Sequence, residues 1–266
     1  MATTTLTGST GNDILNAPGN VTSLVAGFQG DDTITLTLAS DRTQAGSGDD
    51  SITLAGTTSV LNTVVAGSGN DSIFVNTAST TIGGSLGLNE GDDSFVNTSV
   101  QLVNASVGGN AGTDTITLGA GGTNALVGGG LGTDLIGITA GTFTTSTVYG
   151  GGGADTLNVN AGTFTLTTLQ SSDGHDKINA TGATVTNGYI SGGAGLDSIR
   201  IGAFTTSTVA GGGGDDTIVL NTSYVGGRIY GDGGTATGTL NGADVIGGSN
   251  MDVTGDTSIY GAGGND

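Results

Sequence analysis

The stretch GGGLGTDLI at residues 128–136 decides the fold, because versions of it recur along the whole chain. Close copies are GGGGADTL at 150–157, GGAGLDSI at 192–199 and GGGGDDTI at 211–218. In each copy, glycines precede an aspartate, and an apolar residue stands two positions after it. A repeat of roughly 20 residues is typical of solenoid proteins, in which each unit packs only on its neighbours.

One aspartate per repeat stands in a common register along the sequence. These repeat aspartates are Asp13, Asp32, Asp50, Asp71, Asp93, Asp114, Asp134, Asp155, Asp176, Asp197, Asp216, Asp244 and Asp266. The interval between Asp216 and Asp244 is the longest, and we expect an inserted loop there, from Gly233 to Leu240. Glu90 is the only glutamate, so short carboxylates are needed at fixed places in the repeat.

Apolar residues flank the repeat aspartate at two constant distances. Two positions after it stand Leu15, Ile34, Ile52, Ile73, Phe95, Ile116, Ile136, Leu157, Ile178, Ile199, Ile218 and Ile246. Seven positions before it stand Leu6, Val25, Val64, Leu86, Val107, Val127, Val148, Leu169, Ile190, Val209 and Ile259, with Thr43 and Thr237 as exceptions. The alternation around both positions predicts two short strands per repeat, joined by a glycine turn and a small-residue bend.

The fold class that follows is all-β. We expect a right-handed parallel β-solenoid, of the β-roll or β-helix type, with about thirteen coils stacked about 4.8 Å apart. The repeat runs through residues 1–266, which predicts a single domain that is open at its C-terminal end and can be part of a longer chain. With 34% hydrophobic residues and no Trp, a thin core spread along a rod is expected.

Composition restricts the partners. Four Lys plus Arg against 23 Asp plus Glu give a net charge of −19, which disfavours nucleic acids and anionic membranes and favours cations. The chain has no Cys, so disulfides and thiolate chemistry are excluded. No stretch is long and apolar enough to be a membrane helix, and the N-terminal residues lack the apolar core of a signal peptide.

The glycine turns quoted above resemble the nonapeptide repeat of the RTX, or haemolysin-type calcium-binding, family, and the resemblance covers the whole chain. It implies calcium ions sandwiched between successive turns. Glycines permit positive φ, so such a turn can direct several carbonyl oxygens to one point, and calcium takes six to eight oxygens. Here only one side of each coil carries the motif, so we expect several ions in one row.

The expected metal ligands fall into three groups. The first is the thirteen repeat aspartates, from Asp13 to Asp266, and the second is the acidic residues just before them, namely Asp31, Asp49, Asp92 and Asp215. The third is the backbone carbonyls of Gly129, Gly130, Gly132, Gly150, Gly151, Gly153, Gly192, Gly193, Gly195, Gly211, Gly212 and Gly214. Turns lacking one or more glycines, around Asp13, Asp50, Asp71, Asp93, Asp176 and Asp244, depart from the family pattern.

The sequence leaves an alternative open for these turns. Gly-Asp pairs are good turn formers, and aspartate can cap backbone amides with no metal present. Against this, charged aspartates stacked about 5 Å apart would repel by roughly 0.8 kcal/mol per neighbour even in water, and a divalent ion between them reverses the sign.

Two further chemistries are disfavoured. His175, the only histidine, lies in a turn with no third group to form a triad, and zinc would need a His or Cys cluster. Paired threonines such as Thr33 and Thr35 resemble the ladders of ice-binding solenoids. Their columns also contain Phe74, Leu135, Lys177 and Arg200, which would interrupt a flat array.

We therefore expect a calcium-binding structural protein rather than an enzyme. The resemblance favours export by type I secretion to the cell surface or the extracellular space. There the chain would fold with calcium and assemble with itself into a surface layer (S-layer) or filament, with the cell surface as a further partner. The alternatives are the repeat region of a secreted enzyme, toxin or adhesin and, ranked lower, an ice-binding solenoid.

Overall fold

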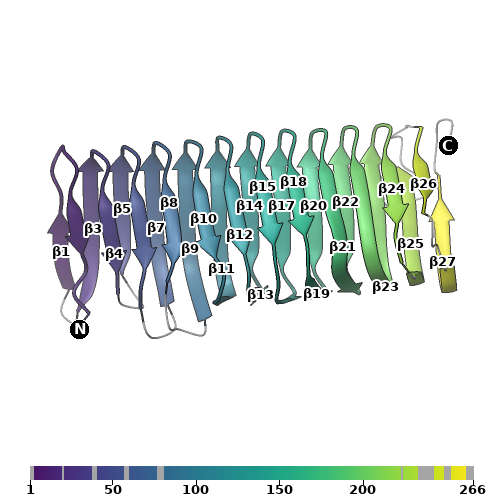
Figure 1. Cartoon of the computed structure of the whole chain (residues 1–266), viewed down its shortest axis with the longest axis horizontal. Helices are drawn as coiled ribbons and strands as arrows, with labels where there is room; N and C mark the ends of the chain where they lie inside the picture. The colour runs from purple at the N-terminus through teal and green to yellow at the C-terminus, as the bar shows by residue number, and fades with distance from the viewer. Residues whose placement is uncertain are drawn as a thin grey trace.

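The protein is a rod of stacked coils, with its two ends far apart (Figure 1). The structure, a computed structural model, describes residues 3–19, 21–37, 41–56, 60–76, 81–222, 224–232, 243–248 and 253–261. Every strand pair in these ranges is parallel, and all 27 strands belong to one continuous sheet. The described ranges contain no helix, and hence none that could cross a membrane. The expected all-β parallel solenoid is confirmed.

The strands that precede the repeat aspartates form one side of the rod, the leading face. They are β1 (Thr3–Thr7), β3 (Thr22–Gln29), β5 (Arg42–Ser47), β7 (Val60–Ser68), β9 (Thr81–Glu90), β11 (Gln101–Ala111), β14 (Leu126–Leu131), β17 (Thr147–Gly152), β20 (Thr168–Asp173), β22 (Tyr189–Ala194), β23 (Ser198–Gly213), β25 (Tyr224–Asp232) and β27 (Val253–Tyr260). Each pairs with the next in this order, so equivalent residues of successive coils lie side by side.

The strands that follow the repeat aspartates form the opposite side, the trailing face. They are β2 (Ile14–Asn16), β4 (Thr33–Leu36), β6 (Ser51–Leu54), β8 (Ser72–Val75), β10 (Ser94–Asn97), β12 (Thr115–Leu118), β15 (Leu135–Ile138), β18 (Thr156–Val159), β21 (Lys177–Thr186), the start of β23, β24 (Thr217–Leu220) and β26 (Val245–Gly247). Its register aligns Ile116, Ile136 and Leu157 in one column. Twelve repeat aspartates, Asp13 to Asp244, lie within the described residues, whereas Asp266, Thr237 and the expected insertion Gly233–Leu240 lie outside them. Fewer than the thirteen expected coils are therefore described in full.

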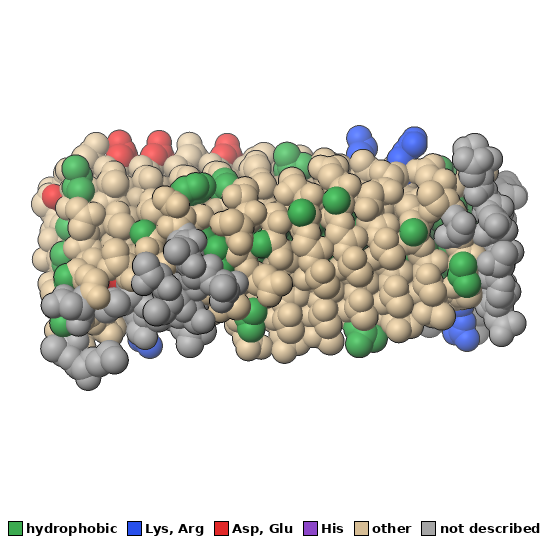
Figure 2. Space-filling model, turned by 60° about the horizontal axis from the view of Figure 1, so that its bottom comes forward, with side chains coloured by type: hydrophobic (Ala, Val, Ile, Leu, Met, Phe, Trp, Pro, Cys, Tyr) green, Lys and Arg blue, Asp and Glu red, His purple; other side chains and the backbone are tan. Residues whose placement is uncertain are grey.

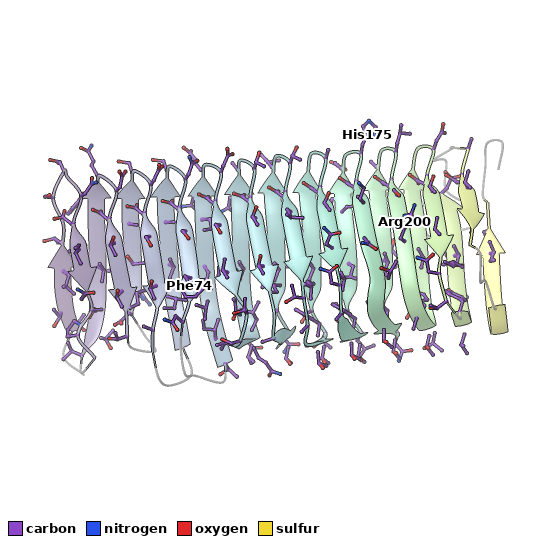
Figure 3. All side chains as sticks on the ribbon, in the orientation of Figure 1. Phe74, His175 and Arg200 are labelled. Atoms are coloured by element: carbon purple, nitrogen blue, oxygen red, sulfur yellow. The ribbon has the colours of Figure 1, made fainter. Side chains whose placement is uncertain are left out.

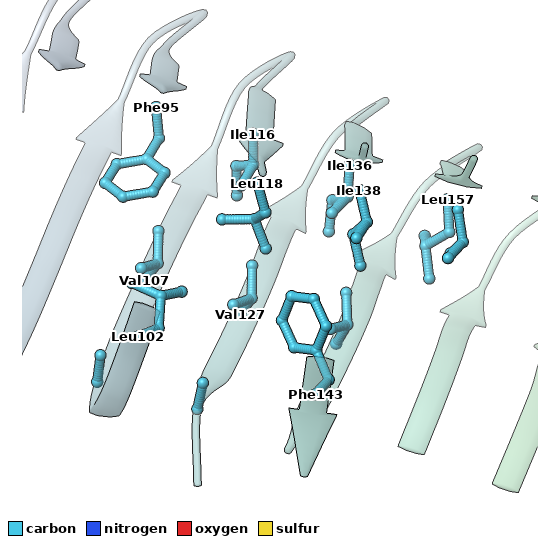
Figure 4. Close-up of a cluster of buried hydrophobic side chains, with 14 of the residues drawn as sticks. Phe95, Leu102, Val107, Ile116, Leu118, Val127, Ile136, Ile138, Phe143 and Leu157 are labelled. Carbon is cyan, nitrogen blue, oxygen red and sulfur yellow. The ribbon is translucent and has the colours of Figure 1, made fainter. Parts of the chain in front are cut away.

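The narrow space between the two faces is filled by the columns that the sequence singled out. The trailing-face column is buried from Leu15 to Ile218, and the leading-face column is buried from Val25 to Val209. Figure 4 shows both columns in the middle of the rod, with Ile116, Ile136 and Leu157 facing Val107 and Val127. Thr43 is buried in the position of an apolar residue, in register with Val25 and Val64.

A third side, the bend face, differs from expectation. The sequence predicts an irregular bend, but the structure has paired strands here. The first residues of β9 and β11 pair at the bend, and from residue 121 onward it contains β13 (Gly121–Thr123), β16 (Thr142–Thr144), β19 (Gly162–Thr165) and the corresponding parts of β21 and β23. Phe143, Phe164, Val185 and Phe204 stack in register beneath it and are buried. A single large side chain per coil closes this end of the core, and this regularity makes the strand possible.

The buried ring of Phe164 yields a prediction about stability. Replacing Phe164 by Ala should lower the free energy of unfolding by about 3 kcal/mol, because it empties a fully buried position in a thin core. The control is Leu131→Ala, where the side chain is 67% exposed, and its effect should stay within about 0.5 kcal/mol. Denaturant unfolding followed by circular dichroism measures both, and equal losses would contradict the burial of Phe164.

A candidate cation-binding row of aspartates

The turn from the leading face to the trailing face buries a column of carboxylates. The repeat aspartates from Asp32 to Asp244 are 0 to 5% exposed. We use the name aspartate row for Asp32, Asp50, Asp71, Asp93, Asp114, Asp134, Asp155, Asp176, Asp197 and Asp216. Each stands immediately before a trailing strand, where parallel pairing stacks it directly on its equivalents in neighbouring coils.

One carboxylate oxygen of each aspartate is used to join coils. The backbone N–H of Asp114 donates to Oδ1 of Asp134 in the next coil at 2.8 Å, and the N–H of Asp134 donates to Oδ1 of Asp155 at 2.8 Å. The same bond recurs from Asp13 through to Asp244, at 2.6 to 3.0 Å. These charge-assisted bonds replace a backbone ladder through the turn.

The other carboxylate oxygen, Oδ2, is buried without a hydrogen-bond donor. This holds for all ten members of the aspartate row. An oxygen that has lost water and gained no partner costs on the order of 1–3 kcal/mol, and more when it is charged. A regular row of such oxygens is therefore evidence for a missing positive charge or proton at each coil.

A glycine five residues before the aspartate makes room for Oδ2. A Cβ atom built on Gly109 would lie less than 3.0 Å from Oδ2 of Asp114 and from the carbonyl oxygen of Gly129 in the next coil. Gly192 has the same relation to Asp197 and to the carbonyl of Gly211. Because the carboxylate oxygen and the carbonyl oxygen both crowd the glycine and neither donates a hydrogen bond, the pair is suited to an oxygen-binding cation such as calcium.

Burial raises the pKa of the nine carboxyl groups of the row from Asp50 to Asp216. Desolvation is the main cause, the backbone N–H of the preceding coil lowers the pKa in part, and neighbouring carboxylates raise it further. The pKa reaches about 7 for Asp71, Asp114 and Asp216. It reaches about 6 for Asp50, Asp155 and Asp197. Without a compensating ion, part of the row is therefore protonated near neutral pH.

A second glycine column, two residues before the aspartate, sets the coil spacing of the turn. A Cβ on Gly132 or Gly153 would lie less than 3.0 Å from the carbonyl oxygen of the equivalent glycine one coil earlier. Both residues also have φ values in the left-handed region, 134° and 133°. Glycine is required here by close backbone approach as well as by the backbone angle.

Only part of the expected glycine ligand set reaches the carboxylates. The carbonyls of Gly129 and Gly211 adjoin Oδ2 of Asp114 and Asp197. In contrast, the carbonyls of Gly130, Gly132, Gly193 and Gly195 point along the rod and pack against the equivalent glycines of the next coil, Gly151, Gly153, Gly212 and Gly214. The carbonyl of Gly192 accepts the hydroxyl of Ser171 at 2.7 Å.

The turns that lack glycines in the sequence also differ from the others in the structure. Ala45, Ala66, Leu88 and Ser171 occupy the position five residues before Asp50, Asp71, Asp93 and Asp176, so a side chain stands where the other coils have glycine. Asp13 differs again, because its Oδ2 accepts the backbone N–H and the hydroxyl of Ser9 at 2.6 and 2.9 Å. These turns are weaker candidates for a cation than those of Asp114 or Asp197.

The acidic residues before the repeat aspartates form a separate, exposed ladder. Oδ1 of Asp31 accepts the N–H of Asp49 at 3.0 Å, and Oδ1 of Asp92 accepts that of Thr113 at 2.8 Å. Asp215 does the same for Ala243 at 2.8 Å. His175 belongs to this outer column too: it is exposed, and its Nδ1 accepts the N–H of Leu196 at 2.9 Å (Figure 3).

Two buried acids were missed by sequence reasoning. Asp41 is fully buried at the bend, where it accepts the N–H groups of Ser23 and Thr37 at 2.8 and 3.1 Å. Asp232 is 1% exposed, lies in register with Gly212, and contributes to the raised pKa of Asp216. An alignment of Asp232 with Gly212, across the long interval between Asp216 and Asp244, would have identified Asp232 as a residue of the turn.

The donor set of the row consists of oxygen atoms alone. Within the described ranges, no three His, Cys, Asp or Glu side chains come together as a metal-binding group. The turns of Asp32, Asp114, Asp197 and Asp216 instead each offer one carboxylate oxygen without a donor and an adjoining backbone carbonyl. Such a set suits a hard cation and lacks the nitrogen and sulfur ligands that zinc prefers.

Comparisons with family models, curated proteins and solved structures found no match for this chain. The similarity to the haemolysin-type repeat rests on the quoted turns alone, and a bound cation is a proposal drawn from the buried oxygens.

The second glycine column provides a test of coil stacking. Gly153→Ala should lower the free energy of unfolding by more than about 2 kcal/mol, because the methyl group would collide with the carbonyl of Gly132. The control is Gly137→Ala, where the nearest atom to the new Cβ lies 3.9 Å away; its effect should be no more than about 1 kcal/mol. Thermal and denaturant unfolding measure both, and a tolerated Gly153→Ala would contradict the close approach.

The raised pKa values predict how the metal-free chain responds to pH. The carboxyl of Asp71 has a pKa of about 7 when folded against 3.8 ordinarily, so the folded state binds more protons between these values. In chelator, the β-structure should therefore be most stable near pH 4 and be lost as the pH rises through 6 and 7. Melting temperatures from pH 4 to 8 measure this, and stability that rises with pH would contradict it.

Proposed function

We propose that this chain is a calcium-binding structural protein that folds outside the cell and assembles with itself on the cell surface. The observation that carries the proposal is the row of ten buried Oδ2 atoms without a donor. A protein with a net charge of −19 that buries carboxylates in a column needs a positive charge inside the column, and its own four Lys and Arg residues do not supply it.

A calcium ion can supply the positive charge inside the aspartate column, which the Lys and Arg side chains of the protein do not supply. Asp32, Asp114, Asp197 and Asp216 each combine an unpartnered Oδ2 with the carbonyl oxygen of the next coil's equivalent residue, at Ala45, Gly129, Gly211 and Gly231. These oxygens would hold the ion, which supplies positive charge between coils. The aspartate's Oδ1 meanwhile keeps its bond to the neighbouring amide, so the turn retains its shape.

The proposal has a consequence for where the chain folds. Extracellular calcium modules bind with dissociation constants of order 10⁻⁴ to 10⁻³ M, far above the free calcium of cytosol. Binding energy of this kind is folding energy, because the unfolded chain has no site. The chain would therefore stay unfolded until exported, in keeping with type I secretion, and would have a structural role rather than a catalytic one.

Self-association is supported by the surface of the same turns. Phe28 and Leu131 stand at the ends of β3 and β14, Leu196 stands in the turn after β22, and the three side chains are 56, 67 and 53% exposed. Apolar side chains in these positions can contact a second copy once calcium has reduced the repulsion between rods.

Calcium titration with circular dichroism and light scattering tests the proposal. We expect β-structure to form at millimolar calcium and to be lost in chelator, followed by growth in particle size. The triple variant Asp114→Asn, Asp155→Asn and Asp197→Asn should raise the midpoint severalfold. The matched control removes the same charge from the exposed column, as Asp31→Asn, Asp49→Asn and Asp215→Asn, and should leave the midpoint nearly unchanged.

Three other outcomes of this experiment would each overturn one part of the proposal. Identical β-structure with and without chelator would overturn calcium-dependent folding. Folding without growth would retain the calcium site and overturn self-assembly, which would favour a repeat region of a larger secreted protein. Equal effects of the buried and exposed triple variants would remove the aspartate row as the site.

A further inference from the structure

The bend face carries a regular array of threonines that the proposed function does not use. Two columns of threonine flank the buried Phe143, Phe164, Val185 and Phe204. We call them the threonine array: Thr142, Thr163 and Thr184 on one side, and Thr144, Thr165, Thr186 and Thr205 on the other. Equivalent members are register partners, so the array repeats at about 4.8 Å along the rod and about 6.6 Å along each strand.

Two coils of the array are nearly flat against each other. The rings of Phe143 and Phe164, which lie directly beneath it, stack with centroids 5.1 Å apart and an interplanar angle of 0°. The next stacked pair, Phe204 and Tyr224, is rotated by 16°. Strands normally twist relative to one another, so the parallel rings show that these two coils are nearly translated copies. The threonines beside these two rings therefore lie close to one plane.

The hydroxyl groups of the threonine array are not used in hydrogen bonds within the described residues. Across the described residues, none of these seven hydroxyls bonds to another protein group, whereas their neighbours Ser146, Thr167 and Ser207 donate to the carbonyls of Thr144, Thr165 and Thr205 at 3.0, 3.1 and 2.7 Å. Thr142, Thr163 and Thr184 are exposed, and the second column is half-buried. The array therefore offers hydroxyl and methyl groups to water at fixed positions.

One edge of the array is held in place by its own ladder. The residue after the second threonine column has positive φ in successive coils, as at Asn124, Thr145 and Asn187. The hydroxyl of Thr145 donates to Oδ1 of Asn124, and that of Thr206 donates to Oδ1 of Asn187. These bonds run along the rod on either side of Leu166, which has the same positive φ, is 57% exposed and interrupts them, so they fix two separate stretches of the edge.

No charge interrupts this face. Between residues 121 and 206, the described bend-face residues include no Asp, Glu, Lys or Arg. Figure 2 turns the bend side forward and shows its right-hand half covered by regularly spaced uncharged side chains, with charged groups at the edges. The trailing face differs, because its threonine columns are interrupted by Phe74, Leu135 and Arg200, as expected (Figure 3).

We propose that the threonine array binds the surface of ice. A ligand complementary to a plane that repeats in two directions must itself repeat in two directions, and ice presents rows of water oxygens at comparable spacings. Fixed hydroxyls can join such rows while the methyl groups beside them occupy the gaps. A sugar polymer is a poorer fit, because sugar rings stack on exposed aromatic faces and the rings here are fully buried.

This inference depends on the fold and not on which ion fills the aspartate row. The test uses the complete chain under conditions where circular dichroism shows its β-structure. Thermal hysteresis and inhibition of ice recrystallisation are the two measurements. The folded wild-type protein should show both, and their absence would overturn the proposal.

Matched variants locate the binding surface. Thr142→Lys, Thr163→Lys and Thr184→Lys together should reduce the hysteresis at least tenfold, with an unchanged circular dichroism spectrum and melting temperature. The control places the same three substitutions on exposed trailing-face positions, as Thr33→Lys, Thr115→Lys and Thr217→Lys, and should retain the activity. Retained activity in the first set, or equal loss in both, would overturn the assignment to the bend face.

A second triple variant tests the contribution of the hydroxyl groups without the added length and charge of lysine. Thr142→Val, Thr163→Val and Thr184→Val keep the branched shape and the strand preference and replace each hydroxyl with a methyl group. Hysteresis should fall severalfold, less than with lysine, because the methyl groups remain. Unchanged hysteresis would show that the hydroxyl rows do not contact ice and would contradict the mechanism.

Discussion

In-register stacking is the constraint on which every other feature of this molecule depends. Parallel pairing places each residue beside its equivalent in the next coil, so like stacks on like along the whole rod. Isoleucine on isoleucine and phenylalanine on phenylalanine make a stable core from few apolar residues. Aspartate on aspartate would be unfavourable on its own, and the turn must compensate for it.

The turn compensates in two steps that act on different atoms. Oδ1 of each aspartate is neutralised in part by the amide of the preceding coil, which lowers the pKa. Oδ2 has no such partner, and desolvation raises the pKa more than the amide lowers it. A proton or a cation can each satisfy Oδ2, and they compete for the same buried oxygen. A proton and the proposed calcium ion would thus be alternative ways to stabilise one architecture.

The columns of the fold could be predicted from the sequence, because a repeat reveals which positions are equivalent. The strands of both main faces, the buried isoleucines and the aspartate register follow from that equivalence alone. The bend strands were missed, since strands of three or four residues such as β16 and β19 give too short a period to recognise. The Oδ1 ladder and the role of Gly109 were also missed, because they depend on where backbone amides and carbonyls point. Residue types alone do not encode that direction.

Repetition also explains why one rod can carry two unlike surfaces. A coil has a fixed order of turn, strand and bend. A residue type that recurs at one position of the repeat therefore forms a column along one edge of the rod and is absent from the other edges. The edge with aspartates collects negative charge, and the edge with Thr-Phe-Thr segments stays uncharged over 121–206. Since the two edges share only the apolar core, a change in the ion content of one alters the other only through folding. The aspartate row and the threonine array can therefore evolve independently in the same short repeat.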